Sequence, residues 1–190
     1  SVMLAALNSS GTTSIKARKS RNHTELLFKY LKIDIKVKKT KKYDFIDIKP
    51  PKKIPAFNYQ IPGDISSSAF FIALTTLTDD SKLLIKNVNI NSSRVGIITI
   101  LKKMGAKILL KNQKNYRGER ISDIFIKSSK NLNAINCSPE LNSSAIDEFL
   151  ILFLVAARAK GISYFKNIAE LNQKESPRLD WGSKILNMMG

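Results

Sequence analysis

The chain is poor in the residues that build disulfides and metal sites. Its 190 residues include one cysteine, Cys137, and one histidine, His23. A single cysteine cannot form a disulfide within the chain, and it excludes a motif of paired metal-binding cysteines. A single histidine argues against a histidine-based metal site. We therefore expect a protein of the reducing cytoplasm that holds no metal.

Long apolar runs are also absent. The most apolar stretch, Phe149 to Ala157, lies between Glu148 and Arg158. It is far shorter than the roughly 20 residues that a membrane-spanning helix needs. We expect no membrane partner. Hydrophobic residues nevertheless make up 43% of the sequence, which is enough for a buried core.

Acidic residues are scarce. The chain has 15 Asp and Glu against 32 Lys and Arg, which gives a formal net charge of +17. Such a charge favours nucleic acid, an acidic membrane surface or small anionic substrates as partners. The abundance of Lys, Ile and Asn leaves codon bias as an alternative source of the charge.

The basic run Lys36–Lys42 raises the possibility of nucleic-acid binding. Its alternation fits a solvated edge strand better, because lysines protect exposed strand edges. A nucleic-acid-binding module would interleave aromatic and basic residues on one surface. Most of the phenylalanines lie in apolar runs instead, so we expect no nucleic-acid partner.

A unit of apolar helix, short strand, loop and amphipathic helix occurs three times. The matching strand cores are Ile15–Ala17, Ile85–Asn87 and Phe165–Asn167, which are separated by 70 and 80 residues. Further strands follow the units, so each is expected to have the order helix–strand–helix–strand–strand. A repeat of this length predicts stacked α/β units of one fold rather than a solenoid.

Periodicity and capping residues set the expected elements. The predicted helices are residues 2–7, 23–31, 66–77, 93–104, 145–160 and 177–189. The predicted strands are residues 12–17, 33–38, 45–48, 82–88, 106–110, 123–127, 134–137 and 162–167. The prolines of Lys49–Pro55 favour an extended connection. We place a domain boundary just after it, which gives domains of residues 1–61 and 62–190.

Residues 174–178 carry the densest polar chemistry. Ser176 can cap the predicted helix, and Pro177 suits its first position. A helix start attracts anions through its free N–H groups and its dipole. Lys174 and Arg178 add two full charges, so this segment is a candidate phosphate or carboxylate site, with Glu175 as an acid/base residue. The alternative is a capped surface helix with scattered charges. Four apolar residues give this helix an expected buried face: Leu179, Ile185, Leu186 and Met189.

The second helix of every unit begins with a similar polar cluster. These clusters are residues 19–23, 91–94 and 174–178. Serine hydroxyls beside Arg or Lys at a helix start suit a phosphate group. Repeated helix capping is the alternative.

Ser144 and Asp147 precede the most apolar helix. Their spacing is that of a capping box, with Asp in place of Glu. Alternatively, Asp147 is partly desolvated at the mouth of this helix, and a carboxylate in that position can serve as a general base.

Four motifs occur together and in order. They are Ser-Arg-Asn-His-Thr-Glu at 20–25, Ile-Pro-Gly-Asp-Ile-Ser-Ser at 61–67, Asp-Glu at 147–148 and Lys-Glu-Ser-x-Arg-Leu at 174–179. The chain resembles 5-enolpyruvylshikimate-3-phosphate synthases, the 3-phosphoshikimate 1-carboxyvinyltransferases of the shikimate pathway. The resemblance extends over essentially the whole chain.

The resemblance implies an α/β fold of the enolpyruvyl transferase type, an inside-out barrel of repeated βαβαββ units in two domains. Residues 1–61 would be the last part of the first domain. Residues 62–190 would be one unit and most of another from the second, so the fold would be incomplete at both ends. The implied enzyme is a cytoplasmic monomer when full length, and it uses no metal or organic cofactor.

The implied reaction transfers the enolpyruvyl group of phosphoenolpyruvate to the 5-hydroxyl of shikimate 3-phosphate and releases phosphate, on the route to chorismate and the aromatic amino acids. By motif match, Asp147 is the proton acceptor, Glu175 is a second acid/base residue and Lys174 lies where the two substrates meet. The implied ligands are Ser20, Arg21, Asp147 and Lys174 for shikimate 3-phosphate, and Arg178 and Lys174 for phosphoenolpyruvate.

The sequence departs from the family pattern in several places. Pro177 and Asn22 stand where the family usually has Asp. The Ser-Ala-Gln substrate motif, the first-domain Lys and Arg ligands and the C-terminal Arg and Lys ligands are missing. We therefore expect an internal piece of a longer enzyme that has no transferase activity alone. The alternatives are a UDP-N-acetylglucosamine enolpyruvyl transferase, which shares the fold but uses other motifs, a basic nucleic-acid-binding module, and a non-catalytic remnant of the synthase.

Overall fold

The structure is a computed structural model that describes residues 1–190. The chain forms two compact units. The first contains Ser1–Ile61 together with Asn115–Arg120, and the second contains Pro62–Lys114 and Ile121–Gly190. The two-part sequence division did not anticipate that residues 115–120 would group with the first unit. Each unit is described by itself below.

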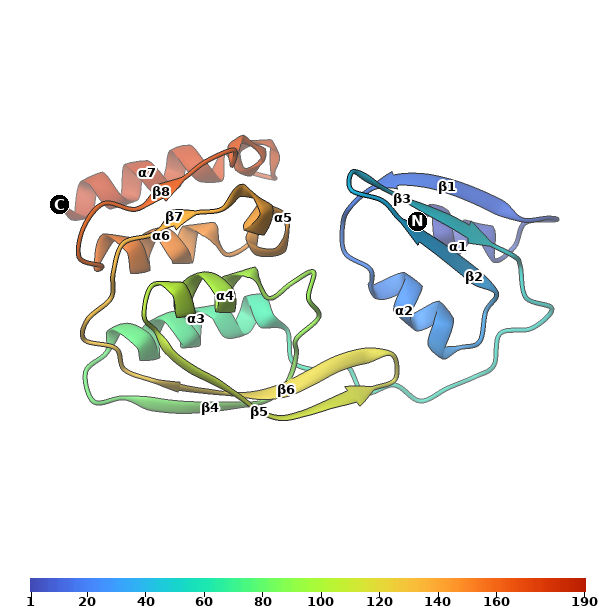
Figure 1. Cartoon of the computed structure of the whole chain (residues 1–190), viewed down its shortest axis with the longest axis horizontal. Helices are drawn as coiled ribbons and strands as arrows, with labels where there is room; N and C mark the ends of the chain where they lie inside the picture. Colours follow the sequence, from blue (N-terminus) through green and yellow to red (C-terminus); the bar gives the residue numbers. More distant parts are fainter. The chain divides into compact units, whose positions relative to one another are not determined.

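The first unit packs two helices on one face of a three-stranded sheet (Figure 1). Its elements are α1 (Val2–Ala6), β1 (Thr13–Arg18), α2 (His23–Tyr30), β2 (Ile35–Lys39) and β3 (Tyr43–Ile48). The strand order is β1-β3-β2, and both pairs are antiparallel. Because side chains alternate along a strand, the isoleucines face the helices and the lysines face solvent. Strand β2 is an edge strand, as its lysines predicted. The buried core consists of Ala6, Phe28, Ile33, Ile46 and Ile48.

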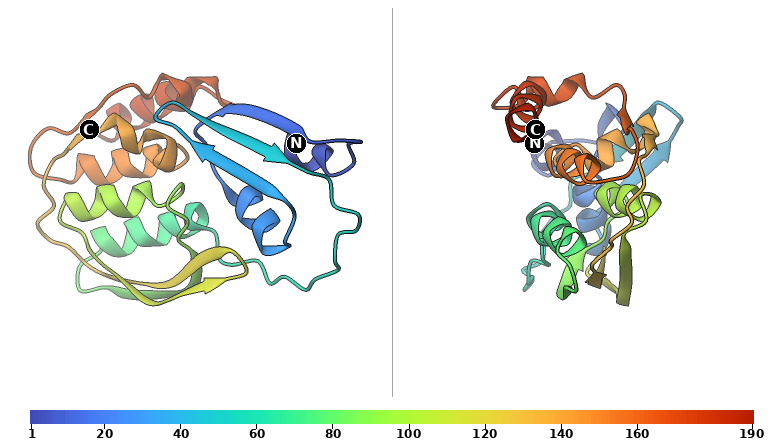
Figure 2. Two further views of the ribbon diagram at one scale, coloured as in Figure 1. Left: turned by 45° about the vertical axis from the view of Figure 1, so that its right-hand side comes forward. Right: turned by 90° about the vertical axis from the view of Figure 1, so that its left-hand side faces the viewer.

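The second unit combines a three-stranded sheet with a layer of helices. The elements that carry its sheet are α3 (Ile65–Leu77), β4 (Lys82–Asn89), α4 (Gly96–Lys103), β5 (Lys107–Tyr116) and β6 (Glu119–Lys127). They are followed by β7 (Asn136–Cys137), the 3-10 turn η1 (Pro139–Leu141), α5 (Asn142–Ala145), α6 (Phe149–Ala157), β8 (Tyr164–Phe165), the 3-10 turn η2 (Ala169–Gln173) and α7 (Arg178–Met189). Helix α6 packs against α3, α4 and α7, and Figure 2 shows these helices side by side.

The topology confirms the predicted repeat. The order β1-α2-β2-β3 recurs as β4-α4-β5-β6, and in both sheets the last strand lies in the middle. Strand β7 pairs in parallel with β8, and Gly63 bridges Val88 in parallel in the preceding repeat. In the third occurrence of the repeated unit, α6 is the apolar helix, β8 is the short strand and α7 is the second helix. The mixed α/β fold class predicted from the repeat is therefore correct.

The predicted helix of residues 145–160 is broken in the structure. Helix α5 ends at Ala145, and α6 begins only at Phe149. Ser144 lies inside α5, where its hydroxyl donates to the carbonyl oxygen of Leu141 at 3.0 Å, and α6 has no side-chain cap, so Ser144 does not occupy the capping position that was expected. Asp147 consequently lies in the turn between two helices.

Strands β5 and β6 are longer than predicted and form a hairpin. The turn residues Arg117 and Gly118 have φ angles of 48° and 90°. Positive φ at both central residues is the geometry of a type I′ turn, which matches the twist of a hairpin. The sequence signal was weak because arginine is not typical of this position. At Gly118 an added Cβ would lie 2.7 Å from the carbonyl oxygen of Leu26, so only glycine fits.

Helix α7 differs from its prediction in two ways. It begins at Arg178, and its capping position is Pro177 rather than Ser176. Half of its expected buried face is exposed: Ile185 is 53% and Met189 is 67% exposed, whereas Leu179 and Leu186 are partly buried. The one buried residue of the helix is Gly182, where an added Cβ would lie 2.5 Å from Leu150 Cδ2. A small residue, not an apolar stripe, therefore brings α7 close to α6.

Candidate active site

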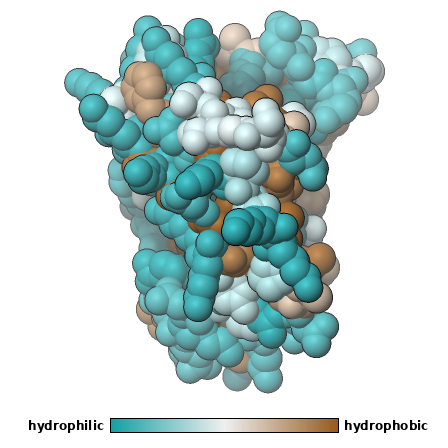
Figure 3. Space-filling model, turned by 90° about the vertical axis from the view of Figure 1, so that its right-hand side faces the viewer, coloured by the Kyte–Doolittle hydropathy of each residue, from teal (hydrophilic) through white to brown (hydrophobic).

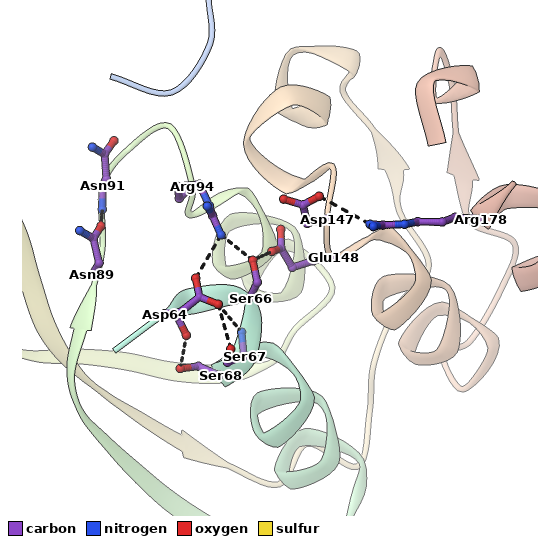
Figure 4. A network of polar contacts seen from close by, with 10 residues as sticks. All are labelled: Asp64, Ser66, Ser67, Ser68, Asn89, Asn91, Arg94, Asp147, Glu148 and Arg178. Atoms are coloured by element: carbon purple, nitrogen blue, oxygen red, sulfur yellow. Dashed lines mark hydrogen bonds and ion pairs between the residues drawn. The ribbon is translucent and has the colours of Figure 1, made fainter. Parts of the chain in front are cut away.

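One carboxylate of the second unit, Asp147, is paired with two cations. Asp147 Oδ1 lies 3.5 Å from Lys174 Nζ and 3.6 Å from Arg178 Nη1. Lys174 follows η2, and Arg178 opens α7. Figure 4 shows the Arg178 side chain extending toward Asp147. The structure thus brings Asp147 together with two residues that lie 27 and 31 positions further along the sequence.

Glu175 joins this cluster through Arg178. Its Oε2 accepts a hydrogen bond from Arg178 Nη2 at 2.8 Å. A hydrogen bond from its own backbone N–H lowers the pKa of Glu175, and the Arg178 guanidinium lowers it further. The Glu175 side chain is 82% exposed, whereas those of Asp147, Lys174 and Arg178 are about one quarter exposed, at 25%, 24% and 27%. Glu175 is therefore an accessible carboxylate at neutral pH.

The cluster can bind an anion. Lys174 and Arg178 are partly desolvated, so their charges are screened less than those of fully exposed side chains. Arg178 offers a planar fork suited to carboxylate and phosphate, and Lys174 offers a compact point charge. Asp147 neutralises part of this charge and orients both side chains. A carboxylate held beside two cations next to an anion site can accept a proton from a bound substrate.

A partly buried polar network adjoins Asp147 and was not predicted. Arg94 Nη2 donates to Asp64 Oδ1 at 3.1 Å and to Ser66 Oγ at 2.6 Å. The Ser66 hydroxyl in turn donates to the carboxylate of Glu148 (Figure 4). Glu148 is only 2% exposed. These residues come from the starts of α3 and α6 and from the loop before α4. The network fixes the backbone on the N-terminal side of α6, directly beside Asp147.

Asp64 also caps α3. Its Oδ2 accepts hydrogen bonds from the backbone N–H and the hydroxyl of Ser67, each at 2.9 Å. Burial alone would raise the pKa of Asp64, but the hydrogen bonds from Ser67 and Ser66 together with the Arg94 charge lower it. The signal that could have found this network is Asp followed three residues later by Ser at a helix start.

The polar cluster at residues 91–94 has no anion-binding geometry of its own. Asn91 Oδ1 accepts from the backbone N–H of Ser93 at 2.9 Å and from its hydroxyl at 2.8 Å. Arg94 is engaged by Asp64 and Ser66. Here the alternative of repeated capping and local structure describes the residues better than a phosphate site.

Ser20 and Arg21 lie in the first unit, in the loop between β1 and α2. Both are exposed, and both line a cavity of about 230 Å³ that also contains Glu25 and Asp44. Glu25 is 8% exposed, and its Oε2 has no hydrogen-bond partner. Asn22 occupies the capping position of α2, but its side chain makes no capping hydrogen bond. Asn22 and Glu25 therefore do not form a complete capping box.

Metal-binding and membrane-spanning features are absent from the described residues 1–190. No three His, Cys, Asp or Glu side chains are grouped so that they could hold a metal ion. None of the helices combines the length and the apolarity that crossing a bilayer requires. Cys137 is buried, and burial raises the pKa of its thiol.

The comparison with protein families decides the assignment. The family model of EPSP synthase (3-phosphoshikimate 1-carboxyvinyltransferase) matches residues 1–190. The chain belongs to the EPSP synthase family.

Relatives and solved structures agree with this assignment. The chain is 40% identical to the 3-phosphoshikimate 1-carboxyvinyltransferase of Thermodesulfovibrio yellowstonii, over 100% of this chain and 44% of the relative. It is 35% identical to the enzyme of that name from Bacillus subtilis, over 100% of this chain and 43% of the relative. The EPSP synthase structure from Acinetobacter baumannii superposes with a TM-score of 0.87 at 36% identity, over 98% of this chain and 41% of that one. The chain thus spans less than half the length of these relatives.

Membership in the EPSP synthase family favours the main sequence prediction over a UDP-N-acetylglucosamine enolpyruvyl transferase and over a basic nucleic-acid-binding module. The relatives compared above are named for 3-phosphoshikimate carboxyvinyl transfer. The incomplete enolpyruvyl transferase fold predicted from the motifs agrees with a close superposition over only 41% of the neighbouring structure.

Proposed function

We propose that this chain is part of a transferase that moves the enolpyruvyl group of phosphoenolpyruvate to the 5-hydroxyl of shikimate 3-phosphate. The observation that carries the proposal is the pairing of Asp147 with both Lys174 and Arg178. All three residues stand at motif positions of the EPSP synthase family. The product would enter aromatic amino-acid biosynthesis in the cytoplasm.

Asp147 is the proposed base of this reaction. The 5-hydroxyl oxygen of shikimate 3-phosphate bonds to C2 of phosphoenolpyruvate, and Asp147 takes the hydroxyl proton. The methylene carbon of phosphoenolpyruvate must gain a proton in the addition and lose one when phosphate leaves. Glu175 is the proposed acid/base group for that carbon, because it is accessible and lies beside Arg178.

The cations of the cluster are the proposed ligands of the reacting groups. Arg178 would bind phosphoenolpyruvate, and Lys174 would contact both substrates, where it stabilises negative charge that develops in the reaction. Ser20 and Arg21 of the first unit are the proposed ligands of the phosphate of shikimate 3-phosphate. We also propose that residues 1–61 and 62–190 derive from the first and second enolpyruvyl transferase domains, and that the full-length enzyme is a monomer.

Calorimetric titration of phosphoenolpyruvate into the 190-residue chain tests the anion site. We expect Lys174→Gln to weaken binding about tenfold, because a charge-assisted contact is lost. Lys184→Gln is the matched control, since Lys184 is an exposed lysine of α7 with its Nζ 5.1 Å from the Trp181 ring. Equal losses in both variants, or no binding by the unsubstituted chain, would contradict the proposed site.

Turnover is a separate measurement. With both substrates present, we expect no phosphate release from the chain alone, because it spans only 44% of its relative from Thermodesulfovibrio yellowstonii. Phosphate release by the unsubstituted chain would contradict this expectation. If it occurs, release that persists in Asp147→Asn would also contradict the role proposed for Asp147.

A further inference from the structure

The open face of the first-unit sheet gathers cations around two aromatic rings. The register of the strands places Lys16, Phe45 and Lys38 side by side across the sheet. The next row toward the β2–β3 turn pairs Arg18 with Tyr43. All of these except Tyr43 are exposed, and Phe45 is 40% exposed in the central strand. The row on the other side consists of Ser14, Asp47 and Lys36.

The cations lie directly beside the rings. Lys16 Nζ is 4.8 Å from the centre of the Tyr43 ring and 5.9 Å from that of Phe45. Lys42 Nζ, in the turn before β3, is 5.5 Å from the centre of the Tyr43 ring. A hollow of about 320 Å³ next to Phe45 is lined by Lys36 and Lys38. Figure 3 shows that hydrophilic side chains cover most of the side of the molecule that it displays, with smaller hydrophobic areas between them.

We propose that this face binds single-stranded nucleic acid. Bases stack on aromatic side chains exposed on a sheet, while neighbouring lysines and arginines contact the phosphates. Tyr43 and Phe45 are two positions apart on one strand, so their Cα atoms are roughly 6.7 Å apart and both side chains point to the same face. This arrangement offers adjacent positions for two bases, with cations on both flanking strands.

The rings decide the class of partner. A simple polyanion would be held by the lysines alone and would gain nothing from Tyr43 and Phe45. Lys16 contacts both rings, but base stacking is the stronger interaction at an exposed ring, so a base can displace the ammonium group.

The expectation of no nucleic-acid partner assumed that phenylalanines lie in apolar runs. Phe45 departs from that pattern, because strand alternation turns it away from the core while Ile46 and Ile48 point inward. The proposed face contains none of the residues assigned to the transferase reaction. The proposal of nucleic-acid binding therefore does not depend on the proposed function.

Fluorescence anisotropy with a labelled single-stranded RNA of about 12 nucleotides tests the proposal. We expect Phe45→Ala to weaken binding about tenfold. Phe125→Ala is the matched control, since Phe125 lies in the central strand of the second-unit sheet and is also approached by lysines. Equal effects of the two substitutions would overturn the proposal, because they would show that the Phe45 ring makes no specific contribution to binding.

Two double variants that remove the same charge test whether the lysines of this face contact phosphates. We expect Lys36→Gln with Lys38→Gln to reduce the slope of log affinity against log salt by about 1.4, since each phosphate contact contributes about 0.7. Lys102→Gln with Lys103→Gln removes the same charge from the last turn of α4 and should leave the slope unchanged. Equal slopes in both double variants would overturn the proposal. Binding to phosphatidylserine vesicles but not to RNA would also overturn it.

Discussion

The pKa of an individual carboxylate in this chain depends on the hydrogen-bond donors around it. Asp123 is an instructive case, because its two oxygens accept hydrogen bonds from Asn112 Nδ2 and from the backbone N–H of Asn87, both at 2.8 Å. The Asn112 amide, and then the Asn87 N–H, lower the pKa of Asp123. Both asparagines adopt positive φ angles, of 51° and 52°. Asparagine tolerates this conformation better than most residues, which lets the backbone bring these donors to Asp123.

This carboxylate predicts a loss of stability in acid. Because the pKa of Asp123 in the folded state is below the ordinary aspartate value of 3.8, Asp123 stabilises the fold above that pH. This contribution is lost as the pH falls through the folded-state pKa. We expect the urea midpoint of unfolding to be lower at about pH 3 than at about pH 6. Asp123→Asn should reduce this difference.

Asp79→Asn is the control for acid stability, because Asp79 is exposed in the loop after α3. That substitution should leave the difference between the two pH values unchanged. An equal effect of the two substitutions would show that general charge repulsion, and not the hydrogen bonds to Asp123, causes the loss.

Among the helices, the junction between α4 and α5 controls where Asp147 lies. Gly96 is the first residue of α4 and is buried. A Cβ built at Gly96 would lie 2.5 Å from Ser144 Oγ and 2.8 Å from the Cβ and backbone N of Ala145. The start of α4 therefore contacts the end of α5 without any intervening side chain. The turn that follows α5 carries Asp147 and Glu148.

Gly96→Ala is expected to destabilise the second unit by about 1–3 kcal/mol, the usual cost of overpacking a tight contact. Alanine has the higher helix propensity, but the gain is only about 1 kcal/mol and the backbone of Ala145 cannot yield as a flexible side chain would. Urea unfolding measures the change. Gly11→Ala is the matched control, since nothing lies within 4 Å of a Cβ at that position. A Gly96 variant as stable as the control would contradict this account of the junction.

At the scale of the whole molecule, the first unit is built from two separate parts of the chain. The tip of the β5–β6 hairpin supplies residues 115–120 to it. Glu119 Oε1 lies 2.5 Å from His23 Nδ1 at the start of α2. The backbone N–H of Gln60 donates to the Tyr116 hydroxyl at 3.2 Å, and the Tyr59 and Tyr116 rings contact each other. The hairpin tip is thus an integral part of the first unit.

Glu119→Gln is expected to loosen the hairpin tip and α2. Glu119 is 5% exposed, and hydrogen bonds to charged groups that are buried in this way contribute about 1.5–3 kcal/mol. We expect amide hydrogen exchange in residues 23–30 and 115–120 to become about tenfold faster or more. Glu140→Gln, an exposed residue of η1, serves as the control. Unchanged exchange in the first unit would show that Glu119 does not anchor the tip.

Local sequence patterns determined much of this protein. Alternation and periodicity identified the strands and helices of the repeat, because each depends on which face of an element is apolar. The prolines after Lys49 indicated the extended segment, and short motifs identified the family. They also singled out Asp147, Lys174 and Arg178, although no local pattern could show whether these residues meet.

Tertiary structure decided the features that depend on contacts between distant segments. Capping rules predicted a continuous helix through Asp147, but packing of Ala145 against Gly96 and burial of Glu148 beside Ser66 favour a break there. The same packing places Asp147 beside Lys174 and Arg178, and internal hydrogen bonds engage Arg94. Residues 115–120 likewise joined the first unit through contacts with α2. The spacing of residues in the sequence shows which side chains are neighbours along one helix or strand. The contacts between distant segments depend instead on which side chains fill the same space and share the same hydrogen-bond donors.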